Sequence, residues 1–315
     1  MKKFIKYSTL IVLIVLTLAF TACSNAPLSV NGHYWFKEPA SFPIGFEEVL
    51  TYDVSFVHKT QSNSNEVKKE GYEILVEDGK LITTLKTEQD ASNKKYVYKT
   101  EFYLKASFVT PNNEPYSFED SFVAESKFTS DFKPISTTKV YKSTLSNYNY
   151  EYQITYGGKN AEVSLVEYAK TDYETPVNYT INNYLDGAFI DNDAILFLPR
   201  AFNIDSSFNV QFSTIDVLSR KLQPMAYQAY LSDENKIDVK NLPNPLATEG
   251  ELIECNHITL RINDTFAGSP IECYYATKHN PYRHRLIELY TTFNFDVFGK
   301  LGYLKYQLVN VNATE

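Results

Sequence analysis

The chain has 315 residues, 43% of them hydrophobic, and a formal net charge of −8. Residues 1–22 hold three lysines and no acid, so the rest of the chain carries 27 basic and 38 acidic residues and a net charge of −11. A surface this acidic repels nucleic acid, which argues against a nucleic-acid partner. The three cysteines show no C-x-x-C spacing, so neither a structural zinc site nor a thioredoxin-like motif is indicated. We expect no cofactor.

Residues 1–22 have the pattern of an export signal. Lysines come first, and residues 7–22 are an uncharged, mostly apolar stretch shorter than the roughly 20 residues that a membrane-spanning helix needs. The stretch ends in FTAC at Cys23, which resembles the lipobox of bacterial lipoproteins, with Phe20 where that signal usually has leucine. The resemblance implies cleavage before Cys23 and a lipid on it that anchors the protein on a membrane. The alternative is a chance cysteine in a plain signal peptide.

Residues 23–46 are predicted to be a lipidated N-terminus and tether, because they contain three prolines and few periodic apolar positions. From residue 47 the chain alternates with a period of two. Leu50, Tyr52, Val54 and Phe56 fall on one face of a strand. We expect residues 47–315 to form a single β-rich domain.

Asp78-Gly79 is a strong signal for a two-residue hairpin turn. Such a turn would pair Ile74 with Thr83 and Tyr72 with Leu85. Tyr72 and Ile74 would then lie on a mostly apolar face.

Gly157-Gly158 predicts a second hairpin, with Tyr152 opposite Val163 and Tyr150 opposite Leu165. Its apolar face carries tyrosines at positions of the same parity: Tyr148, Tyr150, Tyr152 and Tyr156. Such a face can line a hydrophobic groove or close the core of a sheet, since both uses share one sequence pattern.

Residues 192–202 are the exception to the strand pattern. We expect one short kinked helix there, with Asp193 as its N-cap and Pro199 preventing a longer helix. The Asp-Asn-Asp triplet is not a calcium loop, because Leu196 stands where that loop requires glycine. No metal site is predicted.

Four strand-like segments follow in the last third of the chain. Cys255 and Cys273 lie on two of them and could meet across a hairpin. A structural disulfide and a pair of free thiols are both consistent with this spacing.

The mature chain concentrates positive charge in one place, the segment KHNPYRHR. It suggests either an anion-binding or partner-binding patch, or a solvated hairpin tip. The residues concerned are Lys278, His279, Arg283, His284 and Arg285.

No catalytic motif is recognised. G-x-S-x-G and H-E-x-x-H are absent. Glu119 and Asp120 are adjacent carboxylates, but neighbours on a strand point to opposite faces and cannot act as a pair. We therefore expect a protein that is not an enzyme.

Several segments resemble a family of exported bacterial proteins of unknown function, related in architecture to the LolA/LolB/LppX-type lipoprotein and lipid carriers. They are LTYDVSF, DFKPISTTKVY, DNDAILFLPRAF with Arg200, CYYATKHNPYRHRLIELY and GYLKYQLVNV, within about residues 47–311. The resemblance implies a strongly curved antiparallel sheet, an incomplete barrel around an apolar interior, and no catalytic residues.

Together these patterns predict an all-β, mainly antiparallel, membrane-anchored extracytoplasmic lipoprotein. Its expected role is non-catalytic binding or carriage of an apolar or amphipathic ligand, such as a lipid, in a cavity of the sheet. The first alternative is an envelope structural or partner-binding protein with a packed interior. A weaker alternative is a hydrolase whose site is assembled only in space.

Overall fold

The structure is a computed structural model. It describes residues 42–57, 73–90, 93–109, 115–130, 132–145, 149–168, 176–186, 188–201, 208–229, 236–239, 253–262, 270–277, 284–295 and 299–314. The predicted signal (1–22), Cys23 and most of the tether (23–46) therefore lie outside the described residues.

The strands all belong to one sheet. They are β1 (Glu47–Val57), β2 (Glu73–Asp90), β3 (Asn93–Val109), β4 (Pro115–Thr129), β5 (Pro134–Ser143), β6 (Asn149–Tyr156), β7 (Asn160–Tyr168), β8 (Val177–Asn182), β9 (Phe208–Asp216), β10 (Lys221–Ala229), β11 (Lys236–Val239), β12 (Ile253–Ile262), β13 (Ile271–Ala276), β14 (Leu286–Phe295) and β15 (Gly299–Ala313).

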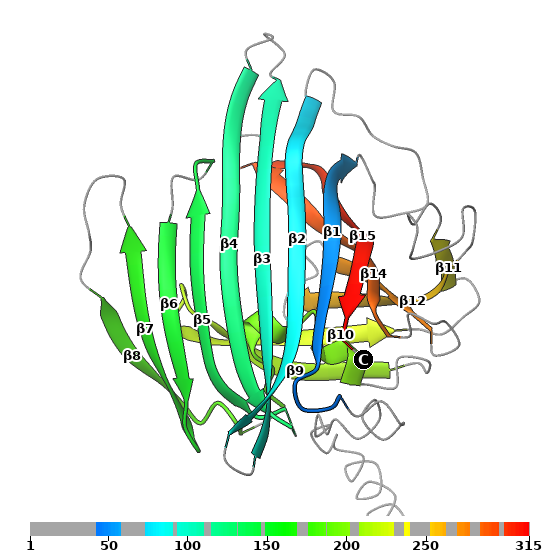
Figure 1. Cartoon of the computed structure of the whole chain (residues 1–315). Helices are drawn as coiled ribbons and strands as arrows, with labels where there is room; N and C mark the ends of the chain where they lie inside the picture. Colours follow the sequence, from blue (N-terminus) through cyan, green and yellow to red (C-terminus); the bar gives the residue numbers. More distant parts are fainter. Residues whose placement is uncertain are drawn as a thin grey trace, which may run out of the picture.

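The expected all-β, antiparallel, curved sheet is confirmed. Its order is β8-β7-β6-β5-β4-β3-β2-β1-β15-β14-β13-β12-β10-β9, with β11 paired to β12 off this path. The first and last strands of the order are not paired with each other, so the sheet is an incomplete barrel. In Figure 1, β9, β10 and β12 cross behind the long strands β1–β4.

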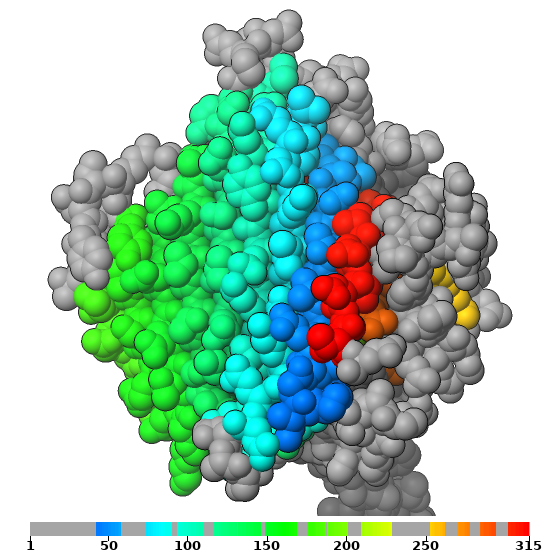
Figure 2. Space-filling model, in the orientation of Figure 1, coloured from blue at the N-terminus to red at the C-terminus, as the bar shows by residue number. Residues whose placement is uncertain are grey.

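Period-two alternation decides which side chains face inward. On β3, Leu104, Ala106 and Phe108 are buried. The intervening Lys105 is on the outer face, in an ion pair with Glu77. Figure 2 shows this outer face, from the green strands to the red β15, as a continuous surface. The alternation read from the sequence therefore points one set of side chains into the barrel and the other into water.

The turn predicted at Asp78-Gly79 is wrong, because β2 runs straight through it. The register with β3 shifts between Val76 and Asp78, which is a β-bulge in a long strand. A Cβ on Gly79 would lie 2.8 Å from the Cβ of Val54. The glycine therefore allows β1 and β2 to approach closely and does not form a turn.

The second hairpin exists, but its register differs from the prediction by two residues. Tyr152 lies opposite Leu165 and Ile154 opposite Val163. Gly157 donates to the carbonyl of Asn160, which makes Gly158-Lys159 the centre of the turn. A shift of two keeps every side chain on its face, so the tyrosine face still points inward.

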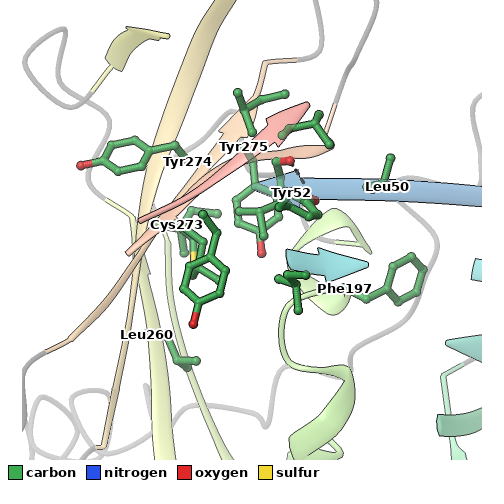
Figure 3. Close-up of a cluster of buried hydrophobic side chains, with 14 of the residues drawn as sticks. Leu50, Tyr52, Phe197, Leu260, Cys273, Tyr274 and Tyr275 are labelled. Carbon is green, nitrogen blue, oxygen red and sulfur yellow. Dashed lines mark hydrogen bonds between the residues drawn. The ribbon is translucent and has the colours of Figure 1, made fainter. Parts of the chain in front are cut away.

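Residues 188–201, here called the plug segment, lie inside the barrel. The expected kinked helix is replaced by two single 3₁₀ turns, Asn192–Ala194 and Leu198–Ala201, and the N-cap is Asp191 rather than Asp193. Phe197 stacks on Tyr98 of β3, and the hydroxyl of Tyr275 on β13 donates to the carbonyl of Leu196 at 2.9 Å. The plug segment thus touches opposite walls and joins the core shown in Figure 3.

The plug segment also covers one end of the sheet. Its residues 188–190 pair with β9, where Ser213 donates to Ala188 and accepts from Ile190. Between β8 and β9, the two ends of the sheet that are not paired with each other, Tyr179 of β8 donates to the carbonyl of Val217 at 2.7 Å. Side chains and the plug segment close the seam that the sheet itself leaves open, which limits unpaired strand edges.

Candidate functional site

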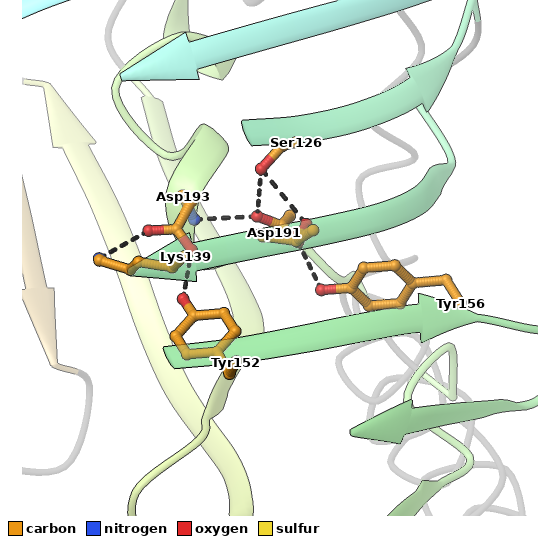
Figure 4. Close-up of polar contacts among 7 residues, drawn as sticks. Ser126, Lys139, Tyr152, Tyr156, Asp191 and Asp193 are labelled. Carbon is orange, nitrogen blue, oxygen red and sulfur yellow. Dashed lines mark hydrogen bonds and ion pairs between the residues drawn. The ribbon is translucent and has the colours of Figure 1, made fainter. Parts of the chain in front are cut away.

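Two carboxylates of the plug segment are held by the wall of β4–β6 (Figure 4). Asp191 accepts from Ser126 at 2.9 Å, from Thr137 at 2.5 Å and from the hydroxyl of Tyr156. The pKa of Asp191 is raised above its usual value, mainly by burial and secondly by the negative charge of Asp193. This group is therefore fully internal and serves to hold the plug segment in place.

Asp193 makes the second attachment. It forms an ion pair of 2.7 Å with Lys139 and accepts from the hydroxyl of Tyr152. Burial lowers the pKa of Lys139, but the charge of Asp193 outweighs it and the net shift is upward. Burial and the same carboxylate raise the pKa of Tyr152 well above its usual value.

The other end of the plug segment is held by a buried ionic triad. Glu48 of β1, 1% exposed, accepts from Arg200 at 2.5 Å and from Arg285 at 2.6 Å. Burial favours the neutral acid, but the two guanidinium groups outweigh it, so the pKa of Glu48 is lowered. The triad joins β1, the plug segment and the connection between β13 and β14.

An aromatic row crosses the inner face just beyond these attachments. Phe102, Phe122, Tyr141 and Tyr150 lie directly opposite one another in register on β3, β4, β5 and β6. All four are half-buried, unlike the fully packed rings around the plug segment. The rings of Phe102 and Phe122 stack at 5.3 Å, and those of Tyr141 and Tyr150 at 5.0 Å.

The row has charged groups on both sides. Lys139, two residues before Tyr141 on β5, places its ammonium 4.7 Å from the centre of the Phe122 ring. Asp120, two residues before Phe122 on β4, lies on the same face, opposite Leu104 and Ser143. Burial raises the pKa of Asp120, although a hydrogen bond with Ser143 opposes the shift.

The predicted tyrosine face is divided between these two environments. Tyr152 and Tyr156 bind the plug segment, and Tyr150 belongs to the row. Ile74 is a buried core residue. Tyr72 and Tyr148 lie outside the described residues.

Two residues of the predicted basic patch, His284 and Arg285, are described by the structure, and they do not form a solvated hairpin tip. Arg285 turns inward to Glu48, and His284 is only 7% exposed. His284 has a φ of 57°, a left-handed conformation that redirects the chain there. Lys278, His279 and Arg283 lie outside the described residues.

Cys255 and Cys273 are buried and are not disulfide-bonded, so the disulfide that the sequence permitted is not formed. Cys255 pairs with Ala276, whereas Cys273 pairs with Ile258. An offset of three residues separates them by about 10 Å along the ladder and points their side chains to opposite faces.

Sequence reasoning missed most of this region. Phe102, Phe122 and Tyr141 sit in three separate strands, so only their register reveals the row. Glu48 was not considered, and Asp120 and Asp191 were weighed only as part of a catalytic pair and of a calcium loop. The position of Asp120 within the apolar alternation of residues 118–124 is nevertheless a usable signal.

No family model matches the chain, and no curated protein matches it in sequence. Among solved structures it is similar to a β-barrel-like protein of domain of unknown function DUF1849 from Brucella abortus. The identity is 8%, the TM-score is 0.51, and the match covers 86% of this chain and 99% of that one. This likeness shows the fold, a β-barrel-like domain of a kind found in bacteria.

No helix within the described ranges is both long and apolar enough to cross a membrane. Those same ranges contain no group of three or more His, Cys, Asp or Glu side chains arranged to hold a metal ion.

Proposed function

We propose that this protein is a non-catalytic binding protein of the bacterial envelope, anchored on a membrane by lipid on Cys23. Its ligand is apolar or amphipathic and lies on the aromatic row. One observation carries this proposal: four rings from four strands are aligned on the inner face of the barrel and remain half-buried.

The contrast with the rest of the interior supports this use of the row. Around the plug segment, rings such as Phe128 and Phe197 are 3% and 1% exposed. A row of large rings left half-buried on a concave face offers apolar area to a ligand, with a few polar groups nearby to orient it. The two acidic plug residues are engaged in internal bonds, which favours a structural role for them over hydrolysis.

A second candidate function is a partner-binding envelope protein without a small ligand. It is favoured by the plug segment, which fills the part of the interior that a larger cargo would need. The two functions differ in one respect: only the first gives the row a ligand.

Native mass spectrometry of residues 24–315, purified from bacterial cells, tests the proposal. All strands lie between Glu47 and Ala313, so this chain contains the whole described sheet. We expect a co-purifying lipid or other amphiphile at about one per chain, and its loss in the double variant Tyr141→Ser/Tyr150→Ser. Tyr103→Ser on the outer face is the matched control. A bare mass that stays bare after incubation with envelope lipids would leave only the partner-binding function.

A further inference from the structure

Asp120 sits in an unusual place for an acid. Its neighbours two residues away on the inner face of β4 are Phe118 and Phe122, and its partner across the ladder to β3 is Leu104. One carboxylate oxygen, Oδ1, is buried and has no hydrogen-bond partner among the described residues. Ser143 on β5 hydrogen-bonds to this carboxyl group, but Oδ1 stays unpartnered. A buried carboxylate oxygen costs free energy unless a positive or donating group satisfies it.

Aromatic residues lie near this carboxylate on the inner face. Its charge acts on Tyr306, whose pKa burial raises to about 12 with a further contribution from Asp120. The ring of Tyr306 lies 6.0 Å from that of Phe102, which stacks on Phe122. Asp120 therefore borders the end of the row formed by Phe102 and Phe122.

The positive charge nearest the row is already neutralised. Lys139 lies on the opposite side of the row from Asp120, with its ammonium 4.7 Å from the centre of the Phe122 ring, and Asp193 pairs with it at 2.7 Å. At the far end of the row, Tyr150 is opposite another acid, Glu167. A ligand on the row thus meets aromatic faces and carboxylates, with no unneutralised cation on the described inner face beside it.

We propose that the ligand is an amphiphile with a cationic, ammonium-type headgroup, which lies against Phe102 on the Asp120 side of Phe122, away from Lys139, and pairs with Asp120. Aromatic faces attract cations, most strongly where water is excluded, and the carboxylate supplies the opposite charge. The alkyl chain then runs along the row toward Tyr141 and Tyr150. This inference rests on the proposed function and adds the class of headgroup.

The test compares three probes with the same alkyl chain below their micellar concentrations: octyltrimethylammonium, octyl sulfate and octyl glucoside. Calorimetric titration of residues 24–315 should give an affinity for the ammonium about tenfold or more above that for the glucoside, equivalent to about 1.4 kcal/mol. The sulfate should bind weakest of the three.

Asp120→Asn should remove the preference for the ammonium while leaving binding of the glucoside unchanged. Glu119→Gln is the matched control, because its side chain points to the outer face of the same strand and its loss should change nothing. Circular dichroism checks that each variant keeps its sheet. Equal affinities of the wild type for all three probes, or a preference that survives in Asp120→Asn, would overturn this inference but leave the proposed function standing. If none of the probes binds and no lipid co-purifies, the proposed function fails as well.

Discussion

Arg200 donates to Glu48 from 152 positions further along the chain, and this contact fastens the plug segment to the first strand of the barrel. Arg285 completes the triad from the β13–β14 connection. Three distant parts of the chain thus meet at one buried carboxylate. Removing one partner of a buried ion pair is far more costly than removing a surface pair, because the remaining charges lose their compensation.

Glu48→Ala should therefore lower the free energy of unfolding by about 3–5 kcal/mol in urea denaturation. The neighbouring Glu47, half-exposed and paired with Lys86, is the matched control. Glu47→Ala should change stability by no more than about 1 kcal/mol. Similar losses in both variants would show that the triad does not hold the plug segment.

The hydroxyl of Tyr156 donates to the buried Asp191, so Tyr156→Phe leaves a carboxylate with one donor fewer. We expect a loss of about 1.5–3 kcal/mol, the range for hydrogen bonds to charged groups. Tyr103→Phe, on the exposed outer face, should alter stability by less than about 0.5 kcal/mol. Thermal unfolding of the two variants side by side makes the comparison, and equal melting temperatures would contradict it.

Gly79 and Gly158 provide a test of packing in the sheet. Gly79→Ala places a methyl group 2.8 Å from Val54, so we expect a loss of about 1–3 kcal/mol. Gly158→Ala meets nothing within 4 Å and should be nearly neutral. If Gly79→Ala is equally neutral in denaturant titrations, β1 and β2 do not approach as closely as described.

The pH dependence of Asp120→Asn follows from the raised pKa of the native carboxyl. Burial raises that pKa above the ordinary 3.8, so the folded protein favours the protonated acid and loses stability as pH rises through the raised value. Asp120→Asn has no ionisable group at this position, so its stability does not fall for this reason as the pH rises. It should be more stable than the wild type at pH 7, and the difference should shrink as the pH falls to about 3.8 and below. A stability difference that is constant from pH 4 to pH 7 would contradict the shift.

The class of fold could be predicted because one face of each strand is buried and the other faces water, which makes apolar and polar residues alternate along the sequence. Leu50, Tyr52 and Val54 were placed on one face of β1, and all three are buried. Asp78-Gly79 misled the prediction because the same dipeptide serves a turn or a bulge, and only the approach of Val54 distinguishes them.

The candidate site was predictable only in part, since it depends on contacts across strands. Tyr150 and Tyr152 share one face, yet one is half-buried in the row and the other bonds to the plug segment. No local pattern separates these roles. Arg285 was assigned to a charged turn because its partner, Glu48, lies 237 positions away.

The central claim is that an amphiphile lies on the aromatic row and not on the outer face. Photo-crosslinking tests it most directly, with an octyltrimethylammonium analogue that carries a diazirine on its alkyl chain. After irradiation and peptide mapping, we predict labels on the inner-face residues of β3–β6 near Phe122, Tyr141 and Tyr150. Labels confined to exposed outer residues such as Tyr103 and Val123, or no saturable labelling, would contradict it.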